Sequence, residues 1–315
     1  MSLPALRALR ERFPSAEISI LAKPWVAGLY QRETFCDRLI PYVSITTSAR
    51  DLRPFGFDCA ILLQNAFGAA LTAFLARIPE RIGYARDGRS PLLTRAIAVP
   101  KPGEIPPHER FYYLELLRRA GIIEAIPESD MIRLDGAGAA LDAGRARFRD
   151  IGMGDVVIGV SPGAAFGSAK RWLPERFAKS ADRVAHELGG TVAIFGSNDE
   201  RDLCASVAAA ITAPSRNFAG ETSLAEFVDL AAACRVYLTN DSGAMHIASA
   251  LGVPTIAIFG ATNDATTGPT GPLARVIRHP VECSPCLKRE CPIDHRCMTR
   301  VESARVVEAA LDLLR

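Results

Sequence analysis

Two apolar runs in the second half of the chain each break into small polar residues and then resume with a helical pattern. The first is residues 156–170, where Val-Val-Ile-Gly-Val leads into Ser-Pro-Gly-Ala-Ala-Phe-Gly-Ser-Ala-Lys. The second is residues 236–246, Val-Tyr-Leu-Thr-Asn-Asp-Ser-Gly-Ala-Met-His. A strand that turns directly into a helix is typical of α/β folds, and the start of such a helix offers backbone N–H groups and a favourable dipole to an anion. Two such turns predict a ligand that carries phosphates.

Alternating strand and helix patterns along the rest of the chain predict two Rossmann-like α/β domains that face a cleft. We expect strands at 17–22, 38–42, 58–63, 81–85, 96–99, 156–160, 191–195, 236–239 and 255–259. We expect helices at 3–13, 67–76, 108–120, 139–150, 174–188, 199–211, 224–233, 244–251 and 302–314. The length of 315 residues suits a first domain at 1–150, a second at 151–300 and a closing helix at 301–315.

The order of the first elements departs from this architecture. A doubly wound domain normally begins with a strand, whereas this chain opens with a helical pattern. We therefore expect the first strand of the N-terminal domain to be missing from this sequence. Residues 121–153 are less regular, and we expect a connecting segment there before the helix at 139–150.

The overall charge of the chain gives no indication of a polyanionic partner. With 37 basic and 35 acidic residues the net charge is +2, which gives no argument for nucleic acid. Arginines gather at 77–89 and 110–119, which fits either a solvated basic face or a surface for an anionic acceptor or membrane. No apolar run approaches the roughly 20 residues that span a bilayer, and the N-terminus lacks the pattern of a signal peptide. We expect a cytoplasmic protein without a transmembrane segment.

The turn after the strand at 156–160 contains the first candidate site residues. Ala164 and Ala165 are small enough to let backbone N–H groups approach an anion, and Lys170 supplies a full positive charge beside them. Lys170 is equally consistent with a solvated loop lysine. Glu200 follows the next predicted strand, where a carboxylate could accept hydrogen bonds from a ribose diol.

The second turn contributes another set of candidates. Asp241 and Ser242 are expected to cap the following helix, Gly243 to keep its entry narrow, and His246 to reach the same anion from the first helical turn. An ordinary helix cap and a core histidine would explain these residues as well. The hypothesis that one pyrophosphate is held by both turns requires that 161–170 and 241–246 lie close together in the fold.

Several competing signatures fail. No Gly-Lys dipeptide, Gly-x-Gly-x-x-Gly or His-Glu-x-x-His occurs, which argues against a common P-loop, a dinucleotide dehydrogenase and a zinc protease. Gly159-x-Ser161-x-Gly163 matches the hydrolase nucleophile elbow, but the oxyanion hole of that motif needs the N–H of the residue after the serine. That residue is Pro162, which has none.

Four cysteines, Cys283, Cys286, Cys291 and Cys297, fall within fifteen residues. The spacing of these cysteines is close to that of common zinc sites but does not match it. A metal site, free thiols that pack a compact loop, and disulfides all remain open from the spacing alone.

The blocks at 161–172, 195–197, 217–222 and 239–246, together with Leu-Pro-Ala-Leu-Arg-Ala-Leu at 3–9, resemble the ADP-heptose:lipopolysaccharide heptosyltransferases, glycosyltransferase family 9. The resemblance runs over nearly the whole chain. It implies a GT-B fold whose C-terminal half binds ADP-L-glycero-β-D-manno-heptose. It places Lys170 on the donor diphosphate, Asp241, Ser242, Gly243 and His246 in the phosphate loop, and Met245 near the adenine.

The resemblance also implies the reaction and the acceptor. A carboxylate base deprotonates a hydroxyl of a heptosylated Kdo–lipid A, which the N-terminal half meets at the inner face of the membrane, and transfer inverts the anomeric carbon. The family's proposed base is an aspartate in a Gly-Asp loop directly before the first helix. This chain starts where that loop ends, so we assign no catalytic residue and expect this form to bind the donor poorly and to turn over negligibly.

Two further readings stay open beside a heptosyltransferase. They are another GT-B enzyme such as a sugar-nucleotide epimerase, and a non-catalytic nucleotide-sugar binder. The resemblance implies no metal at the cysteines, and we predict neither a metal nor a cofactor.

Overall fold

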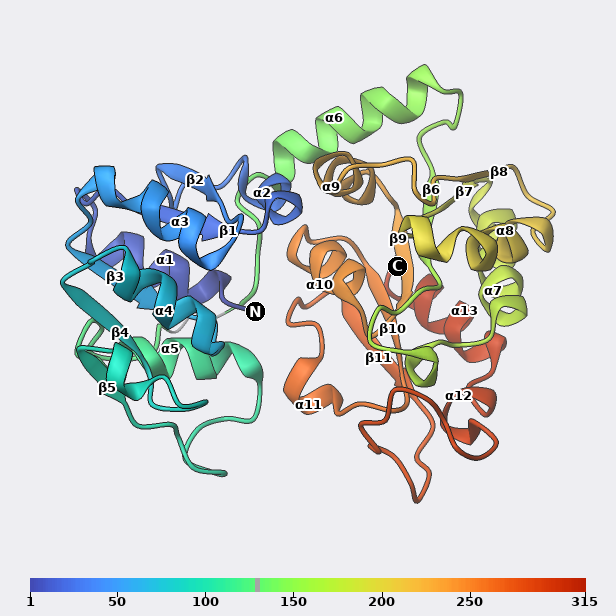
Figure 1. Cartoon of the computed structure of the whole chain (residues 1–315). Helices are drawn as coiled ribbons and strands as arrows, with labels where there is room; N and C mark the ends of the chain where they lie inside the picture. The colour runs from blue at the N-terminus through green and yellow to red at the C-terminus, as the bar shows by residue number, and fades with distance from the viewer. Residues whose placement is uncertain (128–130) are drawn as a thin grey trace. The chain divides into compact units, whose positions relative to one another are not determined.

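The computed structural model describes residues 1–127 and 131–315, and its contacts divide the chain into two units, residues 1–130 and 131–315. Each unit combines helices with strands, and every strand pair described is parallel (Figure 1). The predicted α/β class with Rossmann-like domains is confirmed. Residues 128–130 of the expected connecting segment lie outside the described residues.

The first unit holds two parallel sheets, in the orders β1-β2 and β3-β4-β5. The strands are β1 (Ser19–Ala22), β2 (Arg38–Pro41), β3 (Cys59–Leu62), β4 (Glu80–Tyr84) and β5 (Arg95–Ile97). The helices are α1 (Leu3–Arg12), α2 (Pro24–Tyr30), α3 (Ile45–Leu52), α4 (Phe67–Leu75) and α5 (Glu109–Arg119). Helices α1 and α5 contact each other, as do α3 and α4, which gives the unit two helical layers (Figure 1).

The second unit has a parallel sheet in the order β11-β10-β9-β6-β7-β8. Its strands are β6 (Val157–Ser161), β7 (Thr191–Ile194), β8 (Ser215–Asn217), β9 (Val236–Asn240), β10 (Thr255–Phe259) and β11 (Ala274–Arg278). Its helices are α6 (Ala137–Asp150), α7 (Pro174–Leu188), α8 (Arg201–Ala209), α9 (Leu224–Ala232), α10 (Gly243–Ala250), α11 (Asp264–Thr267), α12 (Arg296–Thr299) and α13 (Ser303–Asp312).

The second sheet is covered on both faces, which explains why its central strands read as continuous apolar runs. Every residue of β6, β9 and β10 is buried. Ile158 and Val160 pack on one face with residues of α7, α8 and α13, and Val157 packs on the other with residues of α6, α9 and α10. Trp172 is fully buried and meets the Phe177 ring edge-on at 5.0 Å, which fixes the start of α7.

The sequence patterns identified the long elements and missed short ones. Helix α7 spans the residues expected for it. Helices α2 and α3 lie between strands, where helices were expected without stated bounds, whereas α11, α12, β8 and β11 were not anticipated. These elements are short or lie at the edge of a sheet, where burial leaves a weak periodic signal.

Helix α6 packs against α9, and a Cβ on Gly144 would lie 2.0 Å from the carbonyl oxygen of Asp229. The structural division at 130 therefore precedes α6, whereas the boundary we expected at 150 follows it. Among the described residues, no helix combines the length and apolar composition that crossing a bilayer requires.

Candidate anion site at the switch point of the second unit

The strand order of the second unit identifies one place where its loops separate. From β6 the chain moves outward through β7 and β8, and it then returns to the other side of β6 to form β9, β10 and β11. The loops after β6 and β9 thus leave the sheet at a topological switch point, where open α/β sheets bind ligands. Ser161, at the end of β6, pairs with Thr239 near the end of β9. The two turns singled out in the sequence therefore start side by side.

The loop after β6 contains a row of backbone donors that make no hydrogen bond within the described chain. Across the described chain, no hydrogen bond is donated by the backbone N–H of any residue from 163 to 168. Ala164 is buried, whereas Ala165 and Phe166 are exposed. Unused N–H groups in a loop of small residues form the kind of surface that binds a phosphate.

The cysteine-containing segment after β11 supports this loop from the side. The backbone N–H of Ala169 donates to the carbonyl of Arg289 at 2.9 Å, and Nε2 of His295 lies 3.0 Å from the carbonyl oxygen of Ala169. Gly167 has φ of 158°, and a Cβ there would lie 2.2 Å from the Arg289 oxygen. Only glycine permits this close approach, so the segment fixes the shape of the anion loop.

Asn240 joins the two turns, and the sequence reading did not single it out. Its side-chain oxygen accepts from the Trp172 backbone N–H at 2.9 Å, and its Nδ2 donates to the Pro162 carbonyl at 2.7 Å. The residue is fully buried. A buried polar side chain at the end of an apolar strand was the signal that could have identified it, because such a group needs hydrogen-bond partners.

Lys170 and Asp241 meet between the turns. Nζ of Lys170 lies 2.6 Å from Oδ2 of Asp241, and the same oxygen accepts from the hydroxyl of Thr262 at 2.6 Å. The two side chains are 14% and 5% exposed. The lysine ammonium also lies 4.9 Å from the centre of the Phe166 ring. The loops are thus close enough to share one anionic ligand, as the pyrophosphate hypothesis requires.

The second turn differs from its expected form in one respect. Ser242 occupies the N-cap position of α10, but its side chain makes no capping bond, and its hydroxyl instead lies 3.2 Å from that of Thr239. Asp241 does not cap either, because its carboxylate is held by Lys170 and Thr262. The expected side-chain cap is therefore wrong.

The start of α10 is consequently open. In the described parts of the chain the N–H groups of 242–245 donate no hydrogen bond, and a Cβ on Gly243 would meet no atom within 4 Å. His246 lies in the first turn of α10 and is half-buried. Uncapped N–H groups with free space before them, at the positive end of a helix dipole, suit an anion.

Glu200 and Met245 complete the set of candidates. Glu200 follows β7 in a capping box, where its carboxylate accepts from the Ser197 N–H at 2.9 Å. A Cβ on Gly163 would lie 2.0 Å from Oε1 of Glu200, so the carboxylate borders the anion loop. The Met245 side chain is fully buried with Ala257 and Phe259, so it packs in the core and is not exposed to a ligand in this structure.

Ser161 has a structural role. Its hydroxyl lies 2.7 Å from the hydroxyl of Tyr237, and both residues are buried. Burial raises the pKa of Tyr237 far above its ordinary value, so the phenol stays neutral. This arrangement agrees with the exclusion of a serine hydrolase.

The cysteines at 283, 286, 291 and 297 are unpaired. Burial, followed by the neighbouring thiols, raises the pKa of Cys297 to about 11. No group of three or more His, Cys, Asp or Glu side chains within residues 1–127 and 131–315 is arranged to hold a metal ion.

Comparison with known proteins shows which family this chain is similar to. The family model "Glycosyltransferase family 9 (heptosyltransferase)" matches residues 45–296. The chain is 33% identical to lipopolysaccharide heptosyltransferase 2 of Salmonella typhimurium, over 88% of this chain and 84% of the relative. It is 32% identical to lipopolysaccharide heptosyltransferase 2 of Escherichia coli, over 88% and 84%. The solved structure of E. coli ADP-heptose lps heptosyltransferase II superposes with a TM-score of 0.84 at 30% identity, covering 99% of this chain and 94% of that one.

Proposed function

Because this chain belongs to glycosyltransferase family 9, the heptosyltransferases, we propose that it transfers L-glycero-D-manno-heptose from ADP-heptose to the heptosyl-Kdo-lipid A inner core of lipopolysaccharide, with inversion. As a family member it is a glycosyltransferase. The proposal concerns its donor, its acceptor and the residues that bind the donor.

The contact between Lys170 and Asp241 carries the proposal for the donor. It brings a cation between the loop that holds the unused N–H groups of 163–168 and the turn that holds those of 242–245. A diphosphate has two negative groups a few ångströms apart, so one loop can bind each phosphate while Lys170 neutralises their charge. Glu200, beside Gly163, is placed to accept hydrogen bonds from the ribose.

The same groups have a role in the chemical step. In a single displacement the acceptor hydroxyl attacks the anomeric carbon while ADP departs, and negative charge develops on the diphosphate. Lys170 and the start of α10 would stabilise that charge in the transition state. We assign no catalytic base.

We further propose that the enzyme works in the cytoplasm and meets its lipid-linked acceptor at the inner face of the membrane. The relatives are named for transfer to lipopolysaccharide or lipooligosaccharide, whose lipid part is membrane-embedded. The first unit supplies the acceptor side in this proposal.

The test is a transfer assay with the full chain, ADP-heptose and a detergent-dispersed acceptor that already carries one heptose. Because the sequence predicts weak donor binding and negligible turnover for this form, the assay uses excess donor and a long incubation. The expected product is a small amount of ADP together with an acceptor heavier by one heptose, and ADP binding should weaken further in Glu200→Ala. Gain of heptose only from a UDP-linked donor would point to a different enzyme. ADP binding without transfer would leave a nucleotide-sugar binder.

A further inference from the structure

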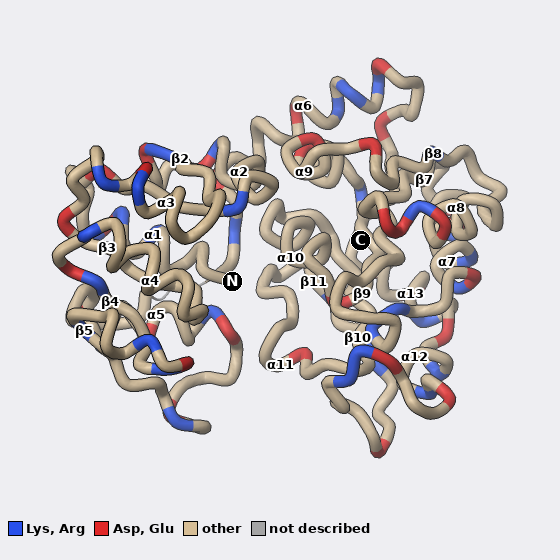
Figure 2. Tube along the Cα trace, in the orientation of Figure 1, with Lys and Arg blue, Asp and Glu red and all other residues tan. Residues whose placement is uncertain are grey.

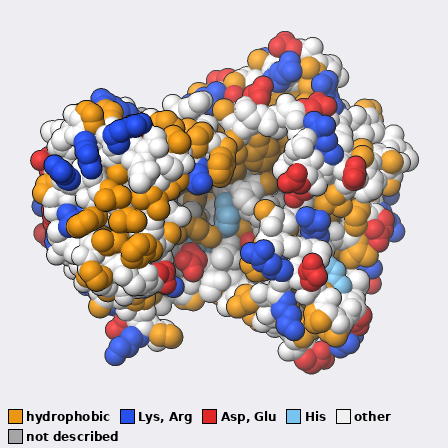
Figure 3. Space-filling model, in the orientation of Figure 1, with side chains coloured by type: hydrophobic (Ala, Val, Ile, Leu, Met, Phe, Trp, Pro, Cys, Tyr) orange, Lys and Arg blue, Asp and Glu red, His pale blue; other side chains and the backbone are white. Residues whose placement is uncertain are grey.

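Helix α4 of the first unit presents an apolar face outward. Its sequence, Phe-Gly-Ala-Ala-Leu-Thr-Ala-Phe-Leu, contains no charged residue, and its trace carries no charge colour in Figure 2. Phe67 and Phe74 are 47% and 45% exposed, and Leu71 and Leu75 are only half-buried. Positions 67, 71, 74 and 75 fall on one helical face. Figure 3 shows hydrophobic side chains gathered over α4 on this side of the unit.

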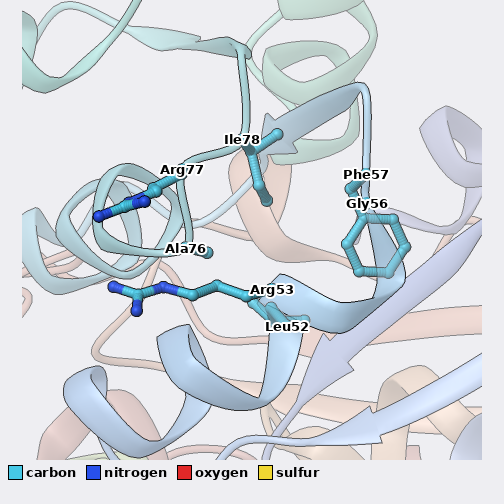
Figure 4. A pocket seen from close by; sticks show the side chains of 7 residues that line it. All are labelled: Leu52, Arg53, Gly56, Phe57, Ala76, Arg77 and Ile78. Carbon is cyan, nitrogen blue, oxygen red and sulfur yellow. The ribbon is translucent and has the colours of Figure 1, made fainter.

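A pocket opens at the C-terminal end of the same helix. Its volume is about 240 Å³, and apolar side chains of Leu52, Phe57, Ala76 and Ile78 line it together with Arg53 and Arg77. The two arginine side chains point to the same side in Figure 4. An apolar floor with two guanidinium groups at the side suits a group that is anionic at one end and apolar at the other.

The arginines at this end have no carboxylate partner in the described parts of the chain. Arg53 donates to the carbonyl of Leu75 at 2.9 Å, and Arg81 donates to that of Leu92 at 2.7 Å while its guanidinium lies 5.4 Å from the Phe74 ring. The backbone N–H of Arg77 donates to the Phe74 carbonyl at 3.0 Å, whereas its guanidinium forms no hydrogen bond or ion pair with any described residue. Arg81 also donates from Nη1 to the carbonyls of Ile78 and Pro79, so its charge is held by three carbonyl groups and has no carboxylate beside it. The Arg77 guanidinium has the most donors free for an anion.

Acidic residues offset little of this charge. Residues 45–81 contain Asp51, Asp58 and Glu80. Asp51 pairs with Arg50 at 3.2 Å, and Glu80 pairs with Arg95 at 3.0 Å. Asp58 is therefore the one acidic residue of this segment that has no arginine partner, whereas three arginines have no carboxylate partner.

The backbone of Arg77 is a further sign that this end of α4 is specialised. Its φ of 62° lies in the left-handed region, which a non-glycine residue adopts only at an energetic penalty. The conformation turns the chain out of α4 at the pocket. Glycine would form this turn more easily, so the presence of arginine requires another explanation.

We propose that the outward face of α4 and the arginine pocket at its end form a docking surface for an anionic phospholipid bilayer. The phenyl rings of Phe67 and Phe74 enter the interface, and Arg53, Arg77 and Arg81 contact lipid phosphates. Aromatic side chains beside arginines are typical of helices that lie in the plane of a membrane interface. Each arginine near an anionic leaflet contributes about a fivefold gain in partitioning. This inference rests on the proposed function, which brings the enzyme to a membrane-embedded acceptor.

Vesicle co-sedimentation of the full chain tests the surface without donor or acceptor. We expect binding to phosphatidylcholine vesicles that contain phosphatidylglycerol, and little binding to phosphatidylcholine alone. Phe74→Ser is expected to weaken binding about tenfold. Arg77→Gly is expected to weaken it about fivefold without lowering the melting temperature, because glycine favours the left-handed backbone.

Matched variants separate this surface from general effects. Phe13→Ser removes another exposed phenylalanine of the first unit, one that also lies beside an arginine, and Arg145→Ala removes an exposed charge on α6. Both should bind vesicles like the unmodified chain. The inference is overturned if these controls lose as much binding as Phe74→Ser and Arg77→Gly, or if the latter two bind normally. It is also overturned if the unmodified chain does not bind vesicles but forms a dimer that Phe74→Ser dissociates.

The transfer assay with detergent-dispersed acceptor distinguishes the two proposals. Transfer without vesicle binding would contradict the proposed docking surface and leave the proposed function unaffected. Vesicle binding with no transfer product, even at excess donor and long incubation, would contradict the proposed function and leave the docking surface.

Discussion

Lys170 Nζ and Asp241 Oδ2, which are 71 positions apart in the chain, lie 2.6 Å apart where the loops after β6 and β9 meet. Asp241 is nearly buried, and its carboxylate has Lys170 and Thr262 as partners. The pair holds the ammonium group between the two loops of the candidate anion site. It also links the stability of the fold to the site.

The first prediction concerns this pair. Lys170→Met leaves the Asp241 carboxylate buried with only a hydroxyl partner, so we expect the free energy of unfolding to fall by about 2–3 kcal/mol. The double variant Lys170→Met/Asp241→Asn should recover most of this loss, because no buried charge remains. Urea denaturation of the two single variants and the double variant forms the double-mutant cycle. Equal losses in all of them would contradict a stabilising pair.

The second prediction separates ligand binding from stability at Gly243. A methyl group there meets no protein atom within 4 Å, so Gly243→Ala should not lower the melting temperature. It would occupy the space in front of the α10 N–H groups, and we expect ADP affinity to fall by about tenfold to a hundredfold. Isothermal titration with ADP measures the change. Gly138→Ala, at an exposed and equally open position on α6, is the control and should bind ADP normally.

The third prediction concerns the packing of α6 on α9. Gly144→Ala places a methyl group 2.0 Å from the carbonyl oxygen of Asp229, so the helices must move apart. We expect a loss of about 2–3 kcal/mol in the free energy of unfolding. Gly138→Ala on the same helix should instead raise it, by up to about 1 kcal/mol, through helix propensity. If both variants had the same stability, the close contact between α6 and α9 would be wrong.

The fourth prediction is a pH dependence from Glu115 on α5. Hydrogen bonds from Arg118, and then from Arg119, lower its pKa below the ordinary value of 4.5, although desolvation opposes them. A carboxyl with a lowered pKa in the folded state stabilises the protein above pH 4.5 and loses that contribution as the pH falls further.

Glu115→Gln should therefore cost about 1 kcal/mol near pH 7 and progressively less between about pH 5 and pH 3. Thermal unfolding of both forms across this range measures the difference. Glu308→Gln, at an exposed position on α13, is the control for the loss of a surface carboxylate. A difference between Glu115→Gln and the unmodified chain that stays constant with pH would refute the assignment.

The sequence was sufficient where a single segment carries its own signal. The apolar runs at β6, β9 and β10 and the amphipathic pattern of α7 depend on local spacing, so they could be identified without the fold. The same holds for the small residues of the loop after β6, because a strand followed by such a loop and a helix predicts an anion site wherever it occurs.

What only the tertiary structure decided concerns partners distant in the chain. The strand order placed β9 beside β6, and this alone brought Asp241 to Lys170 and gave Asn240 and Thr262 their roles. It also showed that Asp241 does not cap α10 and that Met245 packs in the core, since both outcomes depend on neighbours that spacing does not reveal. Local sequence determines which segments become strands, helices and turns, whereas side-chain contacts depend on which of those segments the sheet brings together.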